Sequence, residues 1–135
     1  MISTTAYTSR ALSLLRIVSG FLFIQHGTAK FLGAPHVAMF DGLQVASLMG
    51  AAGALELIGG ALLLIGLFSR PVAFVLSGFM AVAYFMAHAS QGHVLTPILN
   101  QGELAIMFSF VFLFISVAGG GAWSIDALSG KAAAA

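Results

Sequence analysis

Residues 45–68 read VASLMGAAGALELIGGALLLIGLF, and Glu56 is the only charged side chain in this run. A hydrocarbon core of about 30 Å requires roughly 20 apolar residues of helix, so the run is long enough to cross a membrane. It lacks the alternation of polar and apolar residues that is typical of transmembrane β-strands. The run therefore predicts a transmembrane helix.

The whole chain has the composition of an integral membrane protein. Of its 135 residues, 60% are hydrophobic and only 7% are charged, against roughly 25% charged residues in soluble domains. The mean hydropathy is +1.06. This polar material is too little to cover a soluble domain, and the basic residues are too few for a nucleic-acid-binding surface.

Four segments are long and apolar enough to span a membrane. They are Leu12–Phe31, Val45–Phe68, Pro71–Ala89 and Leu104–Ala122. The connection Ser69-Arg70-Pro71 is so short that the helices it joins must be antiparallel, with Pro71 at the start of the second. The segments predict an all-α fold, an antiparallel four-helix bundle that forms a single transmembrane domain over residues 1–135. The stretch HVAMFDGL, residues 36–43, predicts a short turn at the membrane interface.

The basic residues predict the orientation of this bundle. Arg10, Arg70 and Lys131 fall on one side of a four-pass chain, whereas the other side carries Lys30 beside two acidic residues. The positive-inside rule then places both termini in the cytoplasm. Because Arg16 interrupts the first apolar run and no small-residue cleavage site follows, we expect the first helix to be retained.

Polar and small residues form a stripe along the first predicted helix. At about 100° per residue, the stripe occupies an arc of about 120°. Its members are Arg16, Gly20, His26, Gly27 and Lys30. The opposite arc carries Leu14, Val18, Phe21 and Leu32, which suit lipid. We expect the stripe to face protein, because glycines allow helices to approach and polar groups need partners inside a membrane.

Glu56 lies near the middle of the second predicted helix, among glycines and alanines. An ionised carboxylate at the bilayer centre costs at least a few kcal/mol, so it must be paired or protonated. Arg16 is the predicted partner, because it is a permanent charge within the apolar part of the first helix. Such a pair has either a functional role or the purely structural role of fastening two helices.

Further polar residues gather toward the other side of the membrane. They are His26, Lys30, Tyr84, His88, Asn100 and Glu103. Together with Arg16 and Glu56 they are candidate ligand-binding or proton-active residues, since ionisable groups inside a membrane are functional candidates by default. Structural alternatives exist for each. The histidines can bond a neighbouring helix, and Lys30 can extend to the headgroups. Glu103 can cap the last helix, and Asn100 can be part of that cap or of a turn.

The sequence lacks the motifs of soluble enzymes. It contains no cysteine, which excludes disulfides, dithiol exchange and thiolate metal ligands in this chain. Its two intramembrane histidines, His26 and His88, are too dispersed to define a metal site, and we predict no metal ligands. No catalytic residue is identified.

Four sequence elements in order resemble the DoxX family of small bacterial four-helix membrane proteins. They are LLRIVSGFLFIQHGTAKFLG, GALELIGGALLLIGLFSRPVA, NQGELA and GGGAWSIDA, spread from about Arg16 to Asp126. The residues that match the family pattern are Arg16, Gly27, Lys30, Glu56, Asn100, Gly102 and Glu103. The resemblance implies a multi-pass protein of the bacterial inner (plasma) membrane with cytoplasmic termini. It also implies an association with membrane redox chemistry and oxidative stress.

Two functions are consistent with these features. The first is an accessory subunit of a quinone-linked redox system, in which a quinone enters between helices and electrons pass to a membrane or peripheral partner. The alternative is a non-catalytic module that binds or transports a small molecule, lipid or partner helix in the same polar cavity. Four helices enclose only a narrow cavity, so transport would require a homo-oligomer.

Overall fold

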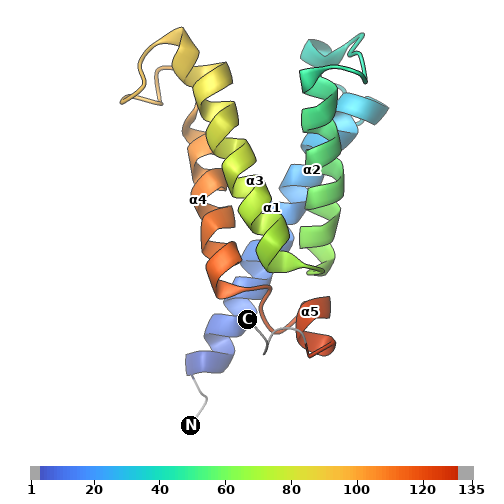
Figure 1. Ribbon diagram of the computed structural model, residues 1–135, viewed down its shortest axis with the longest axis vertical. Helices are drawn as coiled ribbons and strands as arrows, with labels where there is room; N and C mark the ends of the chain where they lie inside the picture. The colour runs from blue at the N-terminus through green and yellow to red at the C-terminus, as the bar shows by residue number, and fades with distance from the viewer. Residues whose placement is uncertain (1–3, 131–135) are drawn as a thin grey trace.

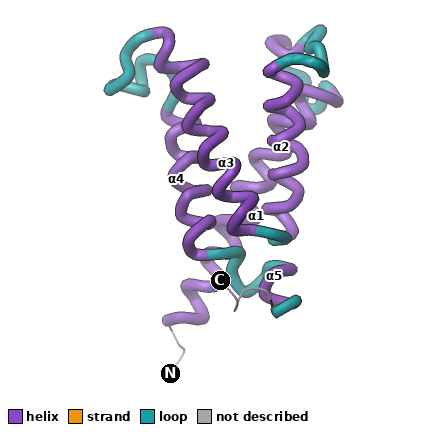
Figure 2. Tube along the Cα trace, in the orientation of Figure 1, coloured by secondary structure: helices purple, strands orange, loops and turns teal. Residues whose placement is uncertain are grey.

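The computed structural model describes residues 4–130, which form helices joined by loops and contain no strand (Figures 1 and 2). The helices are α1 (Thr4–Leu32), α2 (Leu48–Ile65), α3 (Ser69–Ala83), α4 (Glu103–Ala118) and α5 (Ile125–Leu128). The predicted all-α class is confirmed. Three helical segments are long and apolar enough to cross a membrane, namely Thr5–Leu32, Leu48–Ile65 and Ser69–Gln91, whereas α4 is apolar but has only 16 residues.

The first two helices differ from their predicted boundaries. Helix α1 starts at Thr4 rather than Leu12, because the intervening residues contain neither glycine nor proline to stop it. Helix α2 starts at Leu48, where the Ser47 hydroxyl accepts a hydrogen bond from the Gly50 amide at 3.1 Å. It ends before Gly66, which adopts the left-handed conformation with φ of 71°.

The last two long helices also differ from the prediction. Helix α3 starts at Ser69, so Pro71 lies within its first turn rather than at its head. A π-helical turn, Tyr84–His88, and a short 3-10 turn prolong α3. Helix α4 stops at Ala118 instead of Ala122, because Gly119 turns the chain with φ of 93°. The short turn predicted within residues 36–43 is present as a 3-10 turn, Ala38–Phe40.

The long helices form two pairs, α1 with α2 and α3 with α4 (Figure 1). Both pairs meet near the end of the molecule that carries the start of α1, the helix α5 and the α2–α3 turn, which we call the terminal end. They diverge toward the opposite end, which carries the α1–α2 and α3–α4 connections and which we call the connector end (Figure 2).

An apolar core joins the two pairs. It consists of Phe23 from α1, Leu63 from α2, Ala73 and Leu76 from α3, and Phe108, Phe112 and Ile115 from α4. The Phe23 ring contacts the Phe112 ring edge to face, with centroids 5.0 Å apart. Outside this core, the side chains predicted to face lipid on α1 (Leu14, Val18, Phe21 and Leu32) are all exposed, as expected for a helix embedded in a bilayer.

Glycines set the close packing and the register of α1 against α2. A Cβ atom on Gly27 would lie 2.7 Å from the Leu57 backbone nitrogen, and one on Gly20 would lie 2.8 Å from that of Leu64. Gly27 therefore lies opposite Leu57, and Gly20 lies opposite Leu64. Because the chain runs in opposite directions along the two helices, a residue of α1 and a residue of α2 lie at the same height when their numbers sum to about 84. Small residues at such positions allow membrane helices to pack backbone against backbone.

We predict that Gly27→Ala destabilises the protein by about 1–3 kcal/mol, because the added methyl group meets backbone that cannot move aside. Gly78→Ala on α3 is the matched control, since a Cβ there meets nothing within 4 Å. It should leave stability unchanged or raise it by up to about 1 kcal/mol. Unfolding by sodium dodecyl sulfate, followed by circular dichroism, measures both, and equal effects would contradict the packing described.

Candidate functional site

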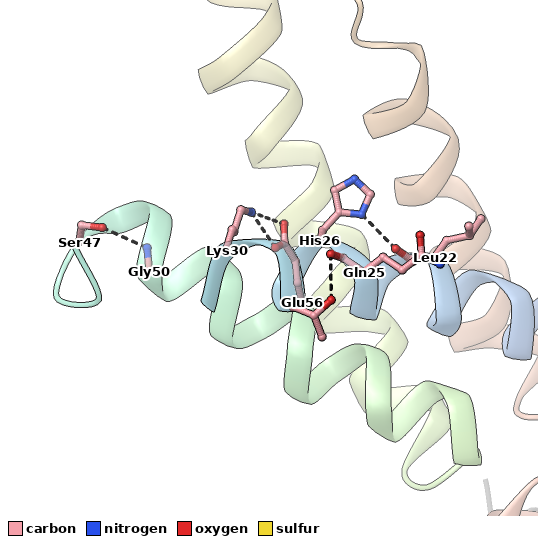
Figure 3. Close-up of polar contacts among 8 residues, drawn as sticks. Leu22, Gln25, His26, Lys30, Ser47, Gly50 and Glu56 are labelled. Carbon is pink, nitrogen blue, oxygen red and sulfur yellow. Dashed lines mark hydrogen bonds and ion pairs between the residues drawn. The ribbon is translucent and has the colours of Figure 1, made fainter. Parts of the chain in front are cut away.

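A buried ion pair joins α1 to α2 toward the connector end (Figure 3). The Lys30 Nζ atom lies 2.6 Å from each carboxylate oxygen of Glu56. The two side chains are only 6% and 7% exposed. The Phe40 ring lies over the ammonium at 5.3 Å from its centroid. Because both carboxylate oxygens bind the ammonium, each charge is compensated within the protein.

The predicted Arg16–Glu56 pair is wrong. The register of α1 against α2 places Glu56 level with residue 28 and Arg16 level with residue 68. This corresponds to about 18 Å along the helix axis, which is beyond the reach of an arginine side chain. Lys30, half a turn from that level on α1, is therefore the cation that meets Glu56.

Arg16 instead binds backbone carbonyls at the terminal end. Its side chain is fully buried and donates to the last turn of α2, to Leu63 O and, at 2.7 Å, to Leu64 O. It also donates to two carbonyls of the segment that follows α4, Gly120 O at 2.7 Å and Trp123 O at 2.9 Å. A cation at the C-terminal end of a helix is favourable because the last carbonyls of the helix lack partners within it.

Asp126 of α5 lies beside this arginine and interacts electrostatically with it. Its carboxylate oxygens accept hydrogen bonds from the amides of Phe68 at 2.9 Å and Ser69 at 2.7 Å. These are the first amides of α3, which has no cap from its own preceding side chain. Sequence reasoning missed this role. The sequence signal for it was the acidic residue of the motif Ser-Ile-Asp-Ala, which follows the last apolar span. This motif falls at the same predicted end of the bundle as Arg16 and Arg70.

His26 is exposed, although the helical wheel placed it at the edge of the stripe that faces protein. Its Nδ1 atom donates to Leu22 O at 3.0 Å, and its ring lies 6.4 Å from the rings of Phe23 and Phe108. Figure 3 shows no bond between His26 and the Lys30–Glu56 pair. The described residues include no partner for Nε2, so that nitrogen can interact with a ligand.

Tyr84, His88 and Asn100 form a separate group on the α3–α4 pair. Asn100 is buried and donates to Gly92 O and His93 O, both at 3.2 Å, while its side-chain oxygen accepts from Gly102 N at 2.9 Å. His88 Nδ1 donates to Asn100 O at 3.0 Å and stacks on Tyr84. Tyr84 Oη donates to Val94 O at 2.7 Å. These bonds fold the α3–α4 connection, in agreement with the structural alternative for Asn100.

The predicted polar cluster is therefore divided between two helix pairs. Lys30, Glu56 and His26 belong to the α1–α2 pair, whereas the group around Asn100 belongs to the pair that diverges from it (Figure 1). Glu103 is exposed at the first residue of α4, where a carboxylate suits the helix dipole. Within residues 4–130, no three histidine or acidic residues come together in a way that could hold a metal ion.

Comparison with known proteins assigns the family. The family model named DoxX matches residues 11–89, more than half of the chain. The chain belongs to the DoxX family. It is also 44% identical over 123 residues to an uncharacterised protein of Haemophilus influenzae, an alignment that covers 89% of this chain and 91% of that protein. No solved structure matches significantly.

The DoxX match contains both buried ionisable centres of α1 and α2. Arg16, Lys30 and Glu56 lie inside the matched residues 11–89, together with Gly27, which sets the register between the helices. Two elements of the sequence resemblance, NQGELA and GGGAWSIDA, lie beyond residue 89. The second of these supplies carbonyls to Arg16, so the structure connects it to the matched part.

We predict that Lys30→Met lowers the free energy of unfolding by about 3–5 kcal/mol, because Glu56 loses its only salt-bridge partner among residues 4–130. The double variant Lys30→Met/Glu56→Leu should recover most of this loss, since no charge is then buried. The exposed pair His36–Asp41 provides the control: His36→Ala should change stability by less than about 1 kcal/mol. Unfolding in sodium dodecyl sulfate measures all three variants, and a double variant less stable than Lys30→Met would refute the pairing.

Proposed function

We propose that this DoxX-family chain is an accessory subunit of a membrane redox system and that its ligand is a quinone-type ring bound beside His26. The observation that carries the proposal is the geometry of this imidazole. Because a carbonyl oxygen only accepts, the bond to Leu22 O requires a proton on Nδ1. The neutral ring then presents an unshared electron pair on Nε2, which accepts a hydrogen bond from a hydroxyl of a reduced quinone.

The surroundings of His26 suit an aromatic ligand. Phe108 lies edge-on to the imidazole at 6.4 Å, and Phe23 and Phe108 belong to the apolar core that joins the helix pairs. Both phenylalanine rings are buried, so they support the imidazole from the protein side, and the oxygen of a ligand would bond to its exposed nitrogen at the edge of this core. His26 itself is exposed, so a ligand within the membrane can reach its ring.

The Lys30–Glu56 pair has a positioning role in this proposal. The ammonium and the carboxylate bind each other, so neither group is free to bind the ligand directly. The pair instead holds the connector half of α1 against α2, about one helical turn from His26. Since the chain contains no cysteine, a separate membrane or peripheral partner would receive the electrons.

We expect His26→Phe to weaken quinone binding by about tenfold, because the ring keeps its packing but loses the hydrogen bond. His36→Phe, a histidine on the exposed α1–α2 connection, is the control and should bind as the wild type does. Protein from native membranes would be analysed by mass spectrometry of an organic extract and then titrated with a quinol analogue. Wild-type affinity in His26→Phe would refute the proposed site.

Electron flow distinguishes the redox function from the alternative. In membrane vesicles, deletion of the chain should lower quinol-dependent reduction of its partner, and His26→Phe should fail to restore it. If the chain binds a small molecule but leaves electron flow unchanged, it is instead a binding or transport module.

We further propose that α1 to α4 cross the inner membrane as an antiparallel bundle and that both termini are cytoplasmic. Arg10 and Arg70 support this orientation, because both lie at the terminal end, where the α2–α3 turn is also found. Lys131, the third basic residue used in the sequence argument, lies outside the described residues. Helix α4 is short, but the segment from Gly102 to Gly119 that contains it is long enough to cross much of the hydrocarbon core.

Cysteine labelling tests this topology directly, because the wild-type chain has no cysteine. In spheroplasts, we expect Leu95→Cys on the α3–α4 connection to react with a membrane-impermeant maleimide, since Leu95 is 93% exposed. Ala6→Cys near the N-terminus should react only after the membrane is permeabilised. The reverse pattern would invert the proposed orientation, and labelling of both sites in sealed spheroplasts would exclude the three crossings proposed between them, because an odd number of crossings places the two sites on opposite sides of the membrane.

A further inference from the structure

A groove at the terminal end lies between the first turns of α1, the start of α3 and the end of α4. Its volume is about 690 Å³. Leu12, Leu15 and Phe114 form apolar walls, and the glycine loop Gly119–Gly121 also lines it. Leu15 and Phe114 are exposed, so the apolar surface of the groove continues onto the lipid-facing side of the helices.

Two polar side chains at one end of the groove have unused hydrogen-bonding capacity. Arg70 donates from Nη1 to Val117 O at 2.7 Å, a bond that uses one of the five N–H donors of its guanidinium group. Ser69 is fully buried, and its Oγ is the one buried side-chain polar atom among residues 4–130 that has no hydrogen-bond partner. A buried hydroxyl without a partner is unfavourable, so a ligand oxygen that accepts from it would relieve that cost.

The charges around this end of the groove favour an anion. Asp126 also lines the groove, but its carboxylate accepts the amides of Phe68 and Ser69 and interacts with the buried Arg16. Its negative charge is therefore already compensated within the protein. Arg70 remains as the guanidinium that lines the groove, and guanidinium groups bind phosphate oxygens through paired N–H donors.

We propose that this groove binds an anionic phospholipid, with the phosphate on Arg70 and Ser69 and an acyl chain along Leu12, Leu15 and Phe114. The apolar walls favour a phospholipid over inorganic phosphate, because inorganic phosphate has no apolar part that could contact them. The cytoplasmic leaflet is rich in anionic lipid, so the inference agrees with the orientation proposed above. It does not depend on quinone binding, because His26 lies on the other side of the apolar core.

Native mass spectrometry of the purified full-length protein, titrated with phosphatidylglycerol, tests the proposal. We expect Arg70→Gln to weaken binding by about tenfold, as the loss of charge-assisted hydrogen bonds implies. Arg10→Gln removes the same charge from the same end of the molecule, but Arg10 does not line the groove. Its effect should stay within about twofold, because Arg10 is exposed and a charge outside the groove is screened by solvent and salt.

A second variant keeps the test decisive if Arg70→Gln does not fold. Ala118 is exposed and lines the groove, so Ala118→Trp fills the groove and leaves Arg70 in place. It should also abolish phosphatidylglycerol binding, while circular dichroism shows an unchanged helical spectrum. Full binding by folded Ala118→Trp, or an equal loss in Arg10→Gln, would overturn the proposal.

Two competitor ligands identify the chemistry that is recognised. Phosphatidylcholine with matched acyl chains should bind more weakly than phosphatidylglycerol, and inorganic phosphate should not displace the lipid. Equal binding of phosphatidylcholine would overturn the preference for an anionic lipid. Displacement by inorganic phosphate would make the groove a site for a free anion instead.

Discussion

The buried guanidinium group of Arg16 is the constraint on which the terminal end of the molecule depends. An arginine is permanently charged, so inside an apolar chain it must find acceptors. It finds them in the last turn of α2 and in the segment after α4, which are far apart in sequence. That segment then places Asp126 against the first amides of α3. One side chain of α1 thereby determines where the other three long helices meet.

The connector end is held together in a different way. The Lys30–Glu56 pair fastens α1 to α2, and the bonds of Asn100 and His88 fold the α3–α4 connection, but the described polar contacts do not join one helix pair to the other there. The phenylalanine-rich core therefore provides the contact between the pairs nearest to this end. This division explains why the helices diverge toward the connector end in Figure 2 and why His26 is accessible beside the core.

Much of the fold could be predicted from hydropathy and glycine placement. The exposed side of α1 and the turn formed around Asn100 agree with the prediction, because both follow from local spacing along one segment. The partner of Glu56 could not be predicted in the same way. Pairing depends on the register between two helices, and the contacts of Gly20 and Gly27 that set this register are visible only in three dimensions. We predicted that Arg16 binds a carboxylate, but its guanidinium group instead donates to backbone carbonyls at the end of a helix. The quinone-type ligand rests on family resemblance and the geometry of His26.

Hydrogen exchange of the C-terminal segment tests the role of Arg16 most directly. The amides of Ala122, Trp123 and Asp126 bond to Ser9 O, Ser13 Oγ and Gly66 O, so their protection reports whether the segment stays docked. In Arg16→Gln, we expect their exchange to accelerate by about a hundredfold, which corresponds to roughly 3 kcal/mol. Amides in the middle of α4 should keep their protection, and Arg10→Gln should exchange as the wild type does. Unchanged protection of these three amides in Arg16→Gln would contradict the account, because it would mean that the segment docks without the buried guanidinium group.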